Sequence, residues 1–362
     1  MNRRTFLSTS LGAAAATAAA PAAAAPILLG FDTYSLTRLK WKAIQLLDFA
    51  AAQKLDTIQF SGPDYYESLE PAYLQKVKDH AARLGIVVES GANSICPSSS
   101  GYDKSRGDAV EYVRLSLRVA KAVGATIIRC YLGSGSDRRG TIPIEGHIEN
   151  IVRTLKAVRS EALDLRIKFA VENHAGDLLA REMKTLITEA GTDFVGSCLD
   201  TGNPVWMAED PLLTMEVLGP YAITTHIRDS VVFEHPRGAA VQWVALGDGS
   251  IDLKKLMELY RKLCPKAAFQ HEVITGGGPR VLNYNEPEFW QIYPKMPAAD
   301  FARFLALAKN GHPLMAPMLI PGRGSNLPPE YQAAVLAQAR VDLVRSLDYS
   351  KKVLDVGVRW RG

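Results

Sequence analysis

Cysteine is scarce in this chain, and the few cysteines present are not clustered. The sequence of 362 residues contains four of them, and no two form a CxxC pair. This wide spacing argues against a disulfide framework, which is typical of small chains with closely spaced cysteines. We therefore interpret the four as buried free thiols: Cys96, Cys130, Cys198 and Cys264.

Three other features are missing, and each argues against a class of protein. The basic residues are scattered and the formal net charge is only +4, whereas nucleic-acid partners usually bind a clustered basic face. No glycine-rich nucleotide-binding sequence follows the first predicted strand, which argues against a doubly wound open sheet. The apolar run at 11–25 is too short and too rich in alanine for stable membrane insertion.

The remaining composition is that of a globular protein. Hydrophobic residues make up 47% of the chain and charged residues 22%. A chain of 362 residues is long enough for one large α/β barrel or for two ordinary domains.

The N-terminus is predicted to be a targeting segment. Residues 2–7 read NRRTFL, which resembles a twin-arginine export motif, and the alanine-rich run that follows contains small-residue cleavage sites before Pro26. We predict a twin-arginine signal peptide at 1–25 and a periplasmic or exported protein; an amphipathic or disordered N-terminus is the alternative. This route carries folded proteins, so a metal ion could be loaded before export.

From Pro26 onward, short apolar runs alternate with segments of helical periodicity. The apolar runs are continuous rather than alternating, as expected for parallel strands that are covered on both faces. Eight predicted strands that alternate with predicted helices indicate an α/β protein with a (β/α)8 TIM barrel. Strands are expected at 27–33, 57–60, 86–89, 125–132, 166–172, 194–200, 222–227 and 267–274, and helices at 41–54, 71–84, 108–123, 144–162, 180–190, 211–218 and 252–263.

The end of the chain departs from a minimal barrel. Residues 230–250 are long for a loop and could form a hairpin at the barrel mouth, while the aromatic-rich stretch 275–295 is expected to influence specificity. We place the barrel at 26–312. Residues 313–362 are predicted to be a Pro/Gly-rich linker and a C-terminal helix at 330–353, packed on the barrel's outside or on a neighbour in a homo-oligomer.

Four predicted strands end in metal-binding residue types. The fifth to eighth strands lead into Glu172, Asp200, His226 and Glu272, respectively. A TIM barrel brings the C-terminal ends of its strands to one mouth, so these side chains should lie side by side. Two glutamates, one aspartate and one histidine suit a hard divalent ion. Taken singly, each could be a surface carboxylate or a core histidine; together they predict a metal site.

The motifs around these residues resemble the xylose isomerase-like TIM barrel superfamily. That superfamily includes sugar phosphate isomerases and epimerases, hydroxypyruvate isomerases, inosose dehydratases and the AP endonuclease 2-like proteins. The resemblance implies one divalent ion held by the same four residues, with Mn²⁺ expected and Mg²⁺, Co²⁺ or Zn²⁺ as alternatives. The matching segments are 171–174 (VENH), 199–203 (LDTGN), 226–229 (HIRD), 247–249 (GDG) and 271–273 (HEV).

Two positions depart from the sugar epimerases of that superfamily. Asn203 stands where they generally carry a substrate-binding histidine, and Val232 where they carry an arginine. Arg228 could replace that arginine, because it shares a strand face with His226; a structural ion pair is the alternative. We also expect His174 to contact substrate, with a supporting role as the alternative. The endonucleases need three metals and more histidines than this chain offers.

The resemblance implies a metal-dependent sugar isomerase or epimerase that works on a ketose or keto-sugar through an enediolate. A bound ion would polarise the carbonyl, and Glu172 and Glu272 would be the catalytic residues that transfer the proton. A lyase acting on a 3-keto-glycoside or an inosose shares this first step and stays open, as does a non-catalytic carbohydrate-binding subunit. Trp206, Trp243 and Trp290 could stack on a sugar or could simply pack.

Overall fold

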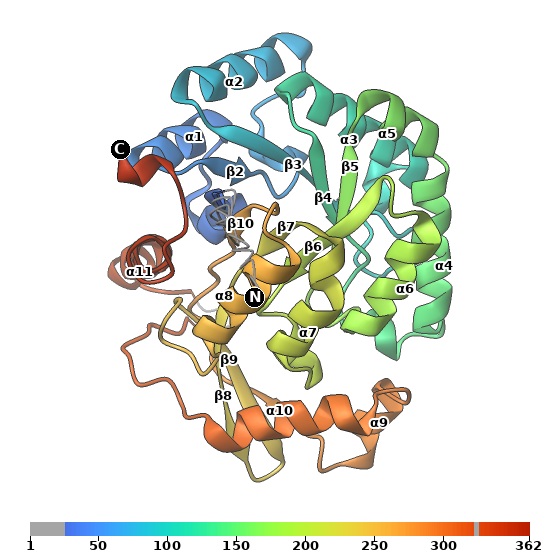
Figure 1. Cartoon of the computed structure of the whole chain (residues 1–362), viewed down its shortest axis with the longest axis vertical. Coiled ribbons are helices and arrows are strands. Elements are labelled where there is room, and N and C mark those ends of the chain that lie inside the picture. The colour runs from blue at the N-terminus through green and yellow to red at the C-terminus, as the bar shows by residue number, and fades with distance from the viewer. Residues whose placement is uncertain (1–25, 322–325) are drawn as a thin grey trace, which may run out of the picture.

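Eight parallel strands form a closed barrel at the centre of the molecule (Figure 1). The computed structural model describes residues 26–321 and 326–362, so the predicted signal peptide at 1–25 lies outside the described residues. Bridges between Thr224 and Ala268 and between Ile227 and His271 join the last strand to the seventh and close the ring. The predicted TIM barrel is confirmed. Its strands are β1 (Leu29–Asp32), β2 (Thr57–Gln59), β3 (Val87–Ser94), β4 (Ile127–Tyr131), β5 (Lys168–Glu172), β6 (Val195–Asp200), β7 (Ala222–His226) and β10 (Phe269–His271).

The helices between these strands surround the barrel, and their ends follow the sequence signals. Asp108, for example, caps α3 by accepting from the backbone N–H groups of Val110 and Glu111, and Gly124 ends it with φ 77°. The helices are α1 (Ala43–Ala52), α2 (Pro71–Leu84), α3 (Ala109–Val123), α4 (Ile144–Lys156), α5 (Arg159–Leu165), α6 (Ala180–Ala190), α7 (Pro211–Leu218) and α8 (Leu253–Leu263). The single helix expected at 144–162 is two helices, because the fully buried Val158 leaves helical geometry between them.

The C-terminal helix α11 (Pro329–Lys352) takes the place of the helix that should follow the eighth strand. It packs against β10 and the 3-10 helix η1 (Thr33–Leu39), and Ser350 Oγ lies 2.7 Å from His271 Nε2. Leu343 and Leu347 are fully buried in the main core. These two side chains are therefore not available to a neighbouring subunit, and self-association stays a prediction.

A small insertion built from two segments, one between β7 and α8 and the other between β10 and α11, carries its own core. The expected hairpin is present as β8 (Asp229–His235) and β9 (Gly238–Val244), and β11 (Arg280–Leu282) adds a third antiparallel strand. Helices α9 (Pro287–Ile292) and α10 (Ala298–Asn310) complete it beside β8 and β9, at the lower end of Figure 1. Helix α10 was not predicted. The insertion's apolar cluster includes Val232, Val241, Leu282 and Phe304.

Two composition-based expectations concern the whole chain. All four cysteines are buried and unpaired, as predicted. Within 26–321 and 326–362, no helix combines the length and apolarity that crossing a membrane requires.

The packing of α11 predicts that the last helix contributes strongly to stability. Leu347→Ala should lower the free energy of unfolding by about 2–5 kcal/mol, because it opens a cavity in the main core. Val341 lies on the same helix and is 52% exposed, so Val341→Ala should cost no more than about 0.5 kcal/mol. Urea denaturation of both variants measures the difference; equal losses would mean that α11 is not part of the barrel.

Candidate metal centre

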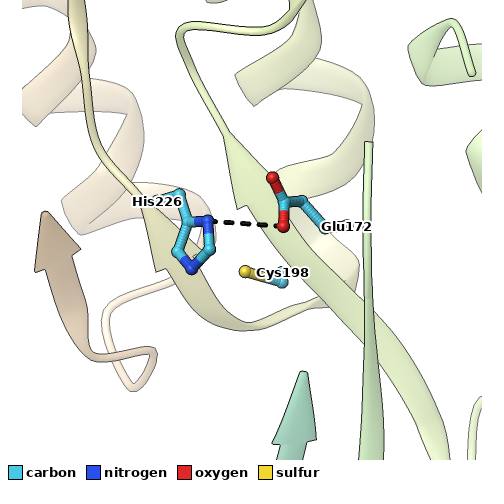
Figure 2. A group of neighbouring side chains, drawn as sticks. All are labelled: Glu172, Cys198 and His226. Carbon is cyan, nitrogen blue, oxygen red and sulfur yellow. Dashed lines mark ion pairs between the residues drawn. The ribbon is translucent and has the colours of Figure 1, made fainter. Parts of the chain in front are cut away.

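The four predicted metal ligands meet at the mouth of the barrel. Glu172, Asp200 and His226 are the last residues of β5, β6 and β7, and Glu272 follows β10 directly. All four side chains are buried, and one ligand atom from each lies within 4.8 Å of the others. His226 Nδ1 is 3.4 Å from Glu172 Oε2, 3.8 Å from Asp200 Oδ2 and 3.6 Å from Glu272 Oε2. Figure 2 shows the first of these contacts, with the imidazole and the carboxylate pointing toward each other.

The ligand atoms of this cluster fit a metal ion. Asp200 Oδ2, His226 Nδ1 and Glu272 Oε2 are buried; the imidazole nitrogen has no hydrogen-bond partner, and the two carboxylate oxygens are ion-paired with Arg228. Most buried polar atoms in proteins do have a hydrogen-bond partner, so an imidazole nitrogen that faces three carboxylates without one fits a cation between them. Ligand atoms that each lie about 2.0–2.2 Å from a shared cation are separated by roughly 3–4 Å, as the atoms around His226 Nδ1 are.

The orientation of His226 is set by a hydrogen-bonded chain from neighbouring strands. Gln59 Nε2 donates to Glu89 Oε2 at 2.7 Å, which turns Gln59 Oε1 toward His226 Nε2 at 2.5 Å. His226 Nε2 must then carry the proton, and the lone pair of Nδ1 points into the cluster. Such partners orient metal-binding imidazoles and raise their basicity. Burial raises the pKa of Glu89 despite the hydrogen bond that it accepts from Thr224.

Glu172 is held by two side chains, Arg129 and Asn203. Arg129 Nε donates to Glu172 Oε2 at 2.5 Å, and a second guanidinium nitrogen of Arg129 forms an ion pair with the same oxygen. Asn203 Nδ2 donates to Glu172 Oε1 at 3.0 Å. Burial opposes ionisation of Glu172, but the charges of Arg129 and His226 outweigh it and hold the pKa of the carboxyl well below its usual range. Glu172 is therefore a firmly ionised group.

The backbone and Oδ1 of Asp200 are fixed by hydrogen bonds, whereas Oδ2 faces His226 and Arg228. Its backbone forms two hydrogen bonds of 2.9 Å with the Asn173 amide. Its Oδ1 accepts from the N–H groups of Gly202 and Asn203 at 2.7 and 2.6 Å, which leaves Oδ2 directed at the cluster. Burial raises the pKa of Asp200 to about 6, although the nearby Arg228 lowers it.

Arg228 lies against the cluster, as the sequence suggested. Its guanidinium forms an ion pair with Glu272, and Nε is 2.8 Å from Asp200 Oδ2. Nε and Nη1 nevertheless have no hydrogen bond, although Arg228 is only 4% exposed. A Cβ on Gly202 would lie 2.5 Å from Arg228 Cδ, so a glycine is needed there. Val232, at the position of the epimerase arginine, is buried in the insertion's apolar cluster and cannot take that role.

His174 lines the same pocket as Glu272 and presents one ring nitrogen to it. Its Nδ1 donates to the carbonyl oxygen of Gly133 at 2.6 Å, so Nε2 is left as an acceptor. The ring is stacked on Tyr131 with centroids 3.9 Å apart. Burial lowers the pKa of His174 to about 4, and the side chain is neutral at physiological pH.

A pocket of about 740 Å³ opens directly onto the cluster. Arg129, His174, Asn203, Arg228 and Glu272 line one end of it. The metal-centre residues are thus accessible to a small molecule, as expected at the C-terminal face of a TIM barrel.

The suggested tryptophan platforms are not available for stacking on a sugar. Trp206 and Trp243 line the pocket but stack on each other, with centroids 4.1 Å apart and planes at 8°. Arg280 covers the other face of Trp206 at 4.7 Å, and Arg228 covers that of Trp243 at 4.4 Å. Trp290 packs on Phe289 and Phe301 within the insertion instead of lining the pocket. Packing is the correct interpretation for all three.

Several residues of the site were missed by the sequence analysis. Asp32, Gln59, Glu89 and Arg129 come from the first four strands, and Cys198 lies near Glu172 and His226 as an alternative third ligand. Cys198 is two residues before Asp200 on β6, so the two side chains share a strand face. Figure 2 shows Cys198 beside Glu172 and His226. The four residues from β1 to β4 could have been found by the pattern that identified the metal ligands, which is a polar residue in or at the end of an apolar strand.

Comparison with known proteins agrees with the fold and the motifs. The profile of the xylose isomerase-like TIM barrel family matches residues 47–272. The chain belongs to this family.

The relatives differ in their reactions. A 3-oxo-isoapionate decarboxylase from Pectobacterium atrosepticum is 25% identical over 202 residues, which cover 54% of this chain and 64% of the relative, slightly less than two thirds of its length. Among solved structures, the D-psicose 3-epimerase of Clostridium cellulolyticum is similar with a TM-score of 0.54 at 17% identity, covering 77% of this chain and 95% of the epimerase. An IOLI protein with a bound zinc atom has the same TM-score at 14% identity, covering 78% and 96%. These two structures share the fold.

The cluster predicts one divalent ion per chain. After incubation with Mn²⁺ and desalting, elemental analysis should find about one ion bound to the protein, and none bound to His226→Ala. Binding at a hundredfold excess over Kd should also stabilise the fold by about 2.7 kcal/mol. His312→Ala is the control, because this exposed histidine contacts only its neighbour Pro313 and should leave the metal content unchanged.

The chain of hydrogen bonds behind His226 predicts a second effect. Gln59→Leu should weaken metal affinity about 10- to 100-fold, because His226 loses the acceptor that fixes its proton on Nε2. Titration with Mn²⁺ under calorimetry measures the affinity. An unchanged Kd would show that the imidazole is oriented without Gln59.

Proposed function

We propose that this protein is a divalent-metal-dependent enzyme that transfers a proton on the carbon next to a carbonyl group of a keto-sugar, as an isomerase or epimerase. The observation that supports this best is the set of four buried ligand side chains at one end of an open pocket. When bound, the ion would supply a Lewis acid that polarises the carbonyl. We propose Mn²⁺, because three of the four ligands are carboxylates, which suit hard cations.

We assign the two proton transfers to side chains of the protein. Glu272 is the one of the four ligands that lines the pocket, so we assign it as the base that removes the proton, with Arg228 ion-paired to its carboxylate. Glu172 lies at the opposite end of the arc of strands β5, β6, β7 and β10; because it is ionised, it would return a proton from the other side only after taking one from solvent. Return to the same carbon gives an epimer, and return to the neighbouring carbon gives an isomer.

Two more residues are positioned to hold the substrate. His174 offers Nε2 as an acceptor for a hydroxyl group, and Arg228 offers Nη1 as a donor for a carbonyl or hydroxyl oxygen, while its Nε faces Asp200. Asn203 adds Oδ1, which is buried without a partner at the pocket's end. In the sugar epimerases that the motifs resemble, a histidine stands at this position; here the amide steadies Glu172.

A lyase is the second candidate, and the contacts of Glu172 favour it. Two nitrogens of Arg129 engage Glu172 Oε2, and Asn203 engages Oε1. Glu272 is ion-paired with Arg228 but lines the pocket, which Glu172 does not, so Glu272 is the better placed base. One base is enough when a leaving group departs after proton removal. The relative from Pectobacterium atrosepticum is a decarboxylase, an enzyme that breaks a carbon–carbon bond.

We further propose that the protein is exported by the twin-arginine route and acts on a small-molecule carbohydrate, without nucleic acid or stable membrane insertion. The support is the NRRTFL sequence at 2–7 and the absence of a basic cluster in the sequence.

The experiment is proton exchange in deuterated water. Purified, Mn²⁺-loaded protein is mixed with keto-sugars, and NMR and mass spectrometry follow the products. We expect deuterium on the carbon next to the carbonyl and a product whose mass changes only by that exchange. Glu272→Gln should slow the exchange at least about 100-fold, because the amide cannot accept the proton.

The control and the alternatives are read from the same samples. Glu288→Gln changes an exposed glutamate on α9 and should exchange at the wild-type rate. Loss of water, carbon dioxide or an aglycone would identify the lyase. Absence of exchange with any keto-sugar by metal-loaded protein would rule out the proposed enzyme and favour a non-catalytic binding protein.

A further inference from the structure

The pocket extends well beyond the metal cluster. At about 740 Å³ it is in the upper part of the range that holds drug-sized ligands, which is more than a single sugar ring fills. The cluster occupies the end formed by β5, β6, β7 and β10. Much of the remaining lining comes from the segments after β1 and β2, which include Tyr34, Thr37, Trp41, Gly62 and Tyr65.

Tyr34 differs from the other aromatic residues of this pocket. Both faces of Trp206 and Trp243 are covered, as described above. Tyr131 is covered by His174 on one side and faces Arg129 at 4.8 Å. Tyr34 is 47% exposed, and no ring or cation stacks on it among the described residues. Trp41 packs on Phe49, and Tyr65 is less exposed than Tyr34, so Tyr34 is the lining aromatic that offers most of its ring to a ligand.

The backbone that carries Tyr34 is tied to the catalytic end of the pocket. Asp32 Oδ1 accepts from Tyr34 N–H at 2.8 Å and so caps the 3-10 helix η1. Ser35 Oγ accepts from the N–H of Val273 at 2.9 Å, and Val273 directly follows Glu272. Tyr34 is thus held in place next to the strand that presents Glu272, so a ligand on its ring would be continuous with one at the cluster.

We infer that the substrate is a two-ring glycoside, whose keto-sugar ring lies at the cluster and whose second sugar ring stacks on Tyr34. This inference rests on the proposed function and narrows its substrate class. Aromatic side chains bind the apolar face of a ring through contact area, and a rigidly held tyrosine loses little conformational entropy on binding. Lys42, whose Nζ donates to the carbonyl oxygen of Asp64 at 2.6 Å, adds a polar edge beside this subsite.

The test compares two substrates that differ only in the second ring. One is a keto-hexose joined to a second pyranose, and the other is the same keto-hexose as its methyl glycoside. Wild-type protein should show a kcat/KM about tenfold or more higher for the disaccharide. Tyr34→Ala should reduce this ratio to about one, while Tyr34→Phe should retain most of it, because the ring is kept.

A matched control removes an exposed tyrosine elsewhere. Tyr331 on α11 is 58% exposed and does not line the pocket, so Tyr331→Ala should leave the ratio unchanged. Equal kcat/KM values for the two substrates in the wild type, or an unchanged ratio in Tyr34→Ala, would overturn the inference while leaving the proposed chemistry intact.

A binding measurement keeps the inference testable if neither substrate reacts. Saturation-transfer NMR with the disaccharide should show contact of both rings with the wild-type protein, and contact of only the keto-sugar ring with Tyr34→Ala. No exchange with either substrate would reject the proposed function alone. A second ring that receives no saturation in the wild type would reject the subsite itself.

Discussion

The structure depends on placing several carboxyl groups together inside a barrel without leaving their charges unbalanced. Asp32, Glu89, Glu172, Asp200 and Glu272 are all nearly or fully buried around His226, and the arginines among them are Arg129 and Arg228. Like charges in a medium of low dielectric repel strongly, so such a group is stable only with compensating cations or protons. A divalent ion would supply much of the missing positive charge. Burial raises the pKa of Glu89, which favours its neutral form and reduces the imbalance further.

Much of the fold and the ligand set could be predicted because both follow from local patterns. Continuous apolar runs mark buried parallel strands, and a TIM barrel gathers the residues at their ends. That was enough to bring Glu172, Asp200, His226 and Glu272 to one mouth. The same rule applied to the first four strands would have included Asp32, Gln59 and Arg129, but amides and arginines inside strands lack a distinctive chemical signature. Their roles depend on which atom faces which, and a sequence does not record this.

The alternatives that the sequence analysis left open are decided by contacts between distant segments. Helix α11 completes the barrel because the eighth strand lacks a helix of its own, and nothing local to 330–353 indicates that its partner is β10. Trp206 and Trp243 looked available for ligand stacking because each is a lone aromatic in a loop. Their faces are covered only because the insertion brings β9 and Arg280 against the end of β6.

That insertion also contacts residues of the candidate metal centre. Trp243 Nε1 donates to the carbonyl oxygen of Gly202 at 2.7 Å, and its ring supports the guanidinium of Arg228. Arg228 in turn lies between Asp200 and Glu272, where its position decides how freely Glu272 can accept a proton. At the other end of the arc, Arg129 constrains Glu172. The two glutamates are thus controlled by different arginines on different supports, one rooted in the barrel wall and the other in the insertion. An enzyme built this way can tune its two proton-transfer groups separately, and the relative freedom of Glu172 and Glu272 decides whether the proton returns to the sugar or a leaving group departs first.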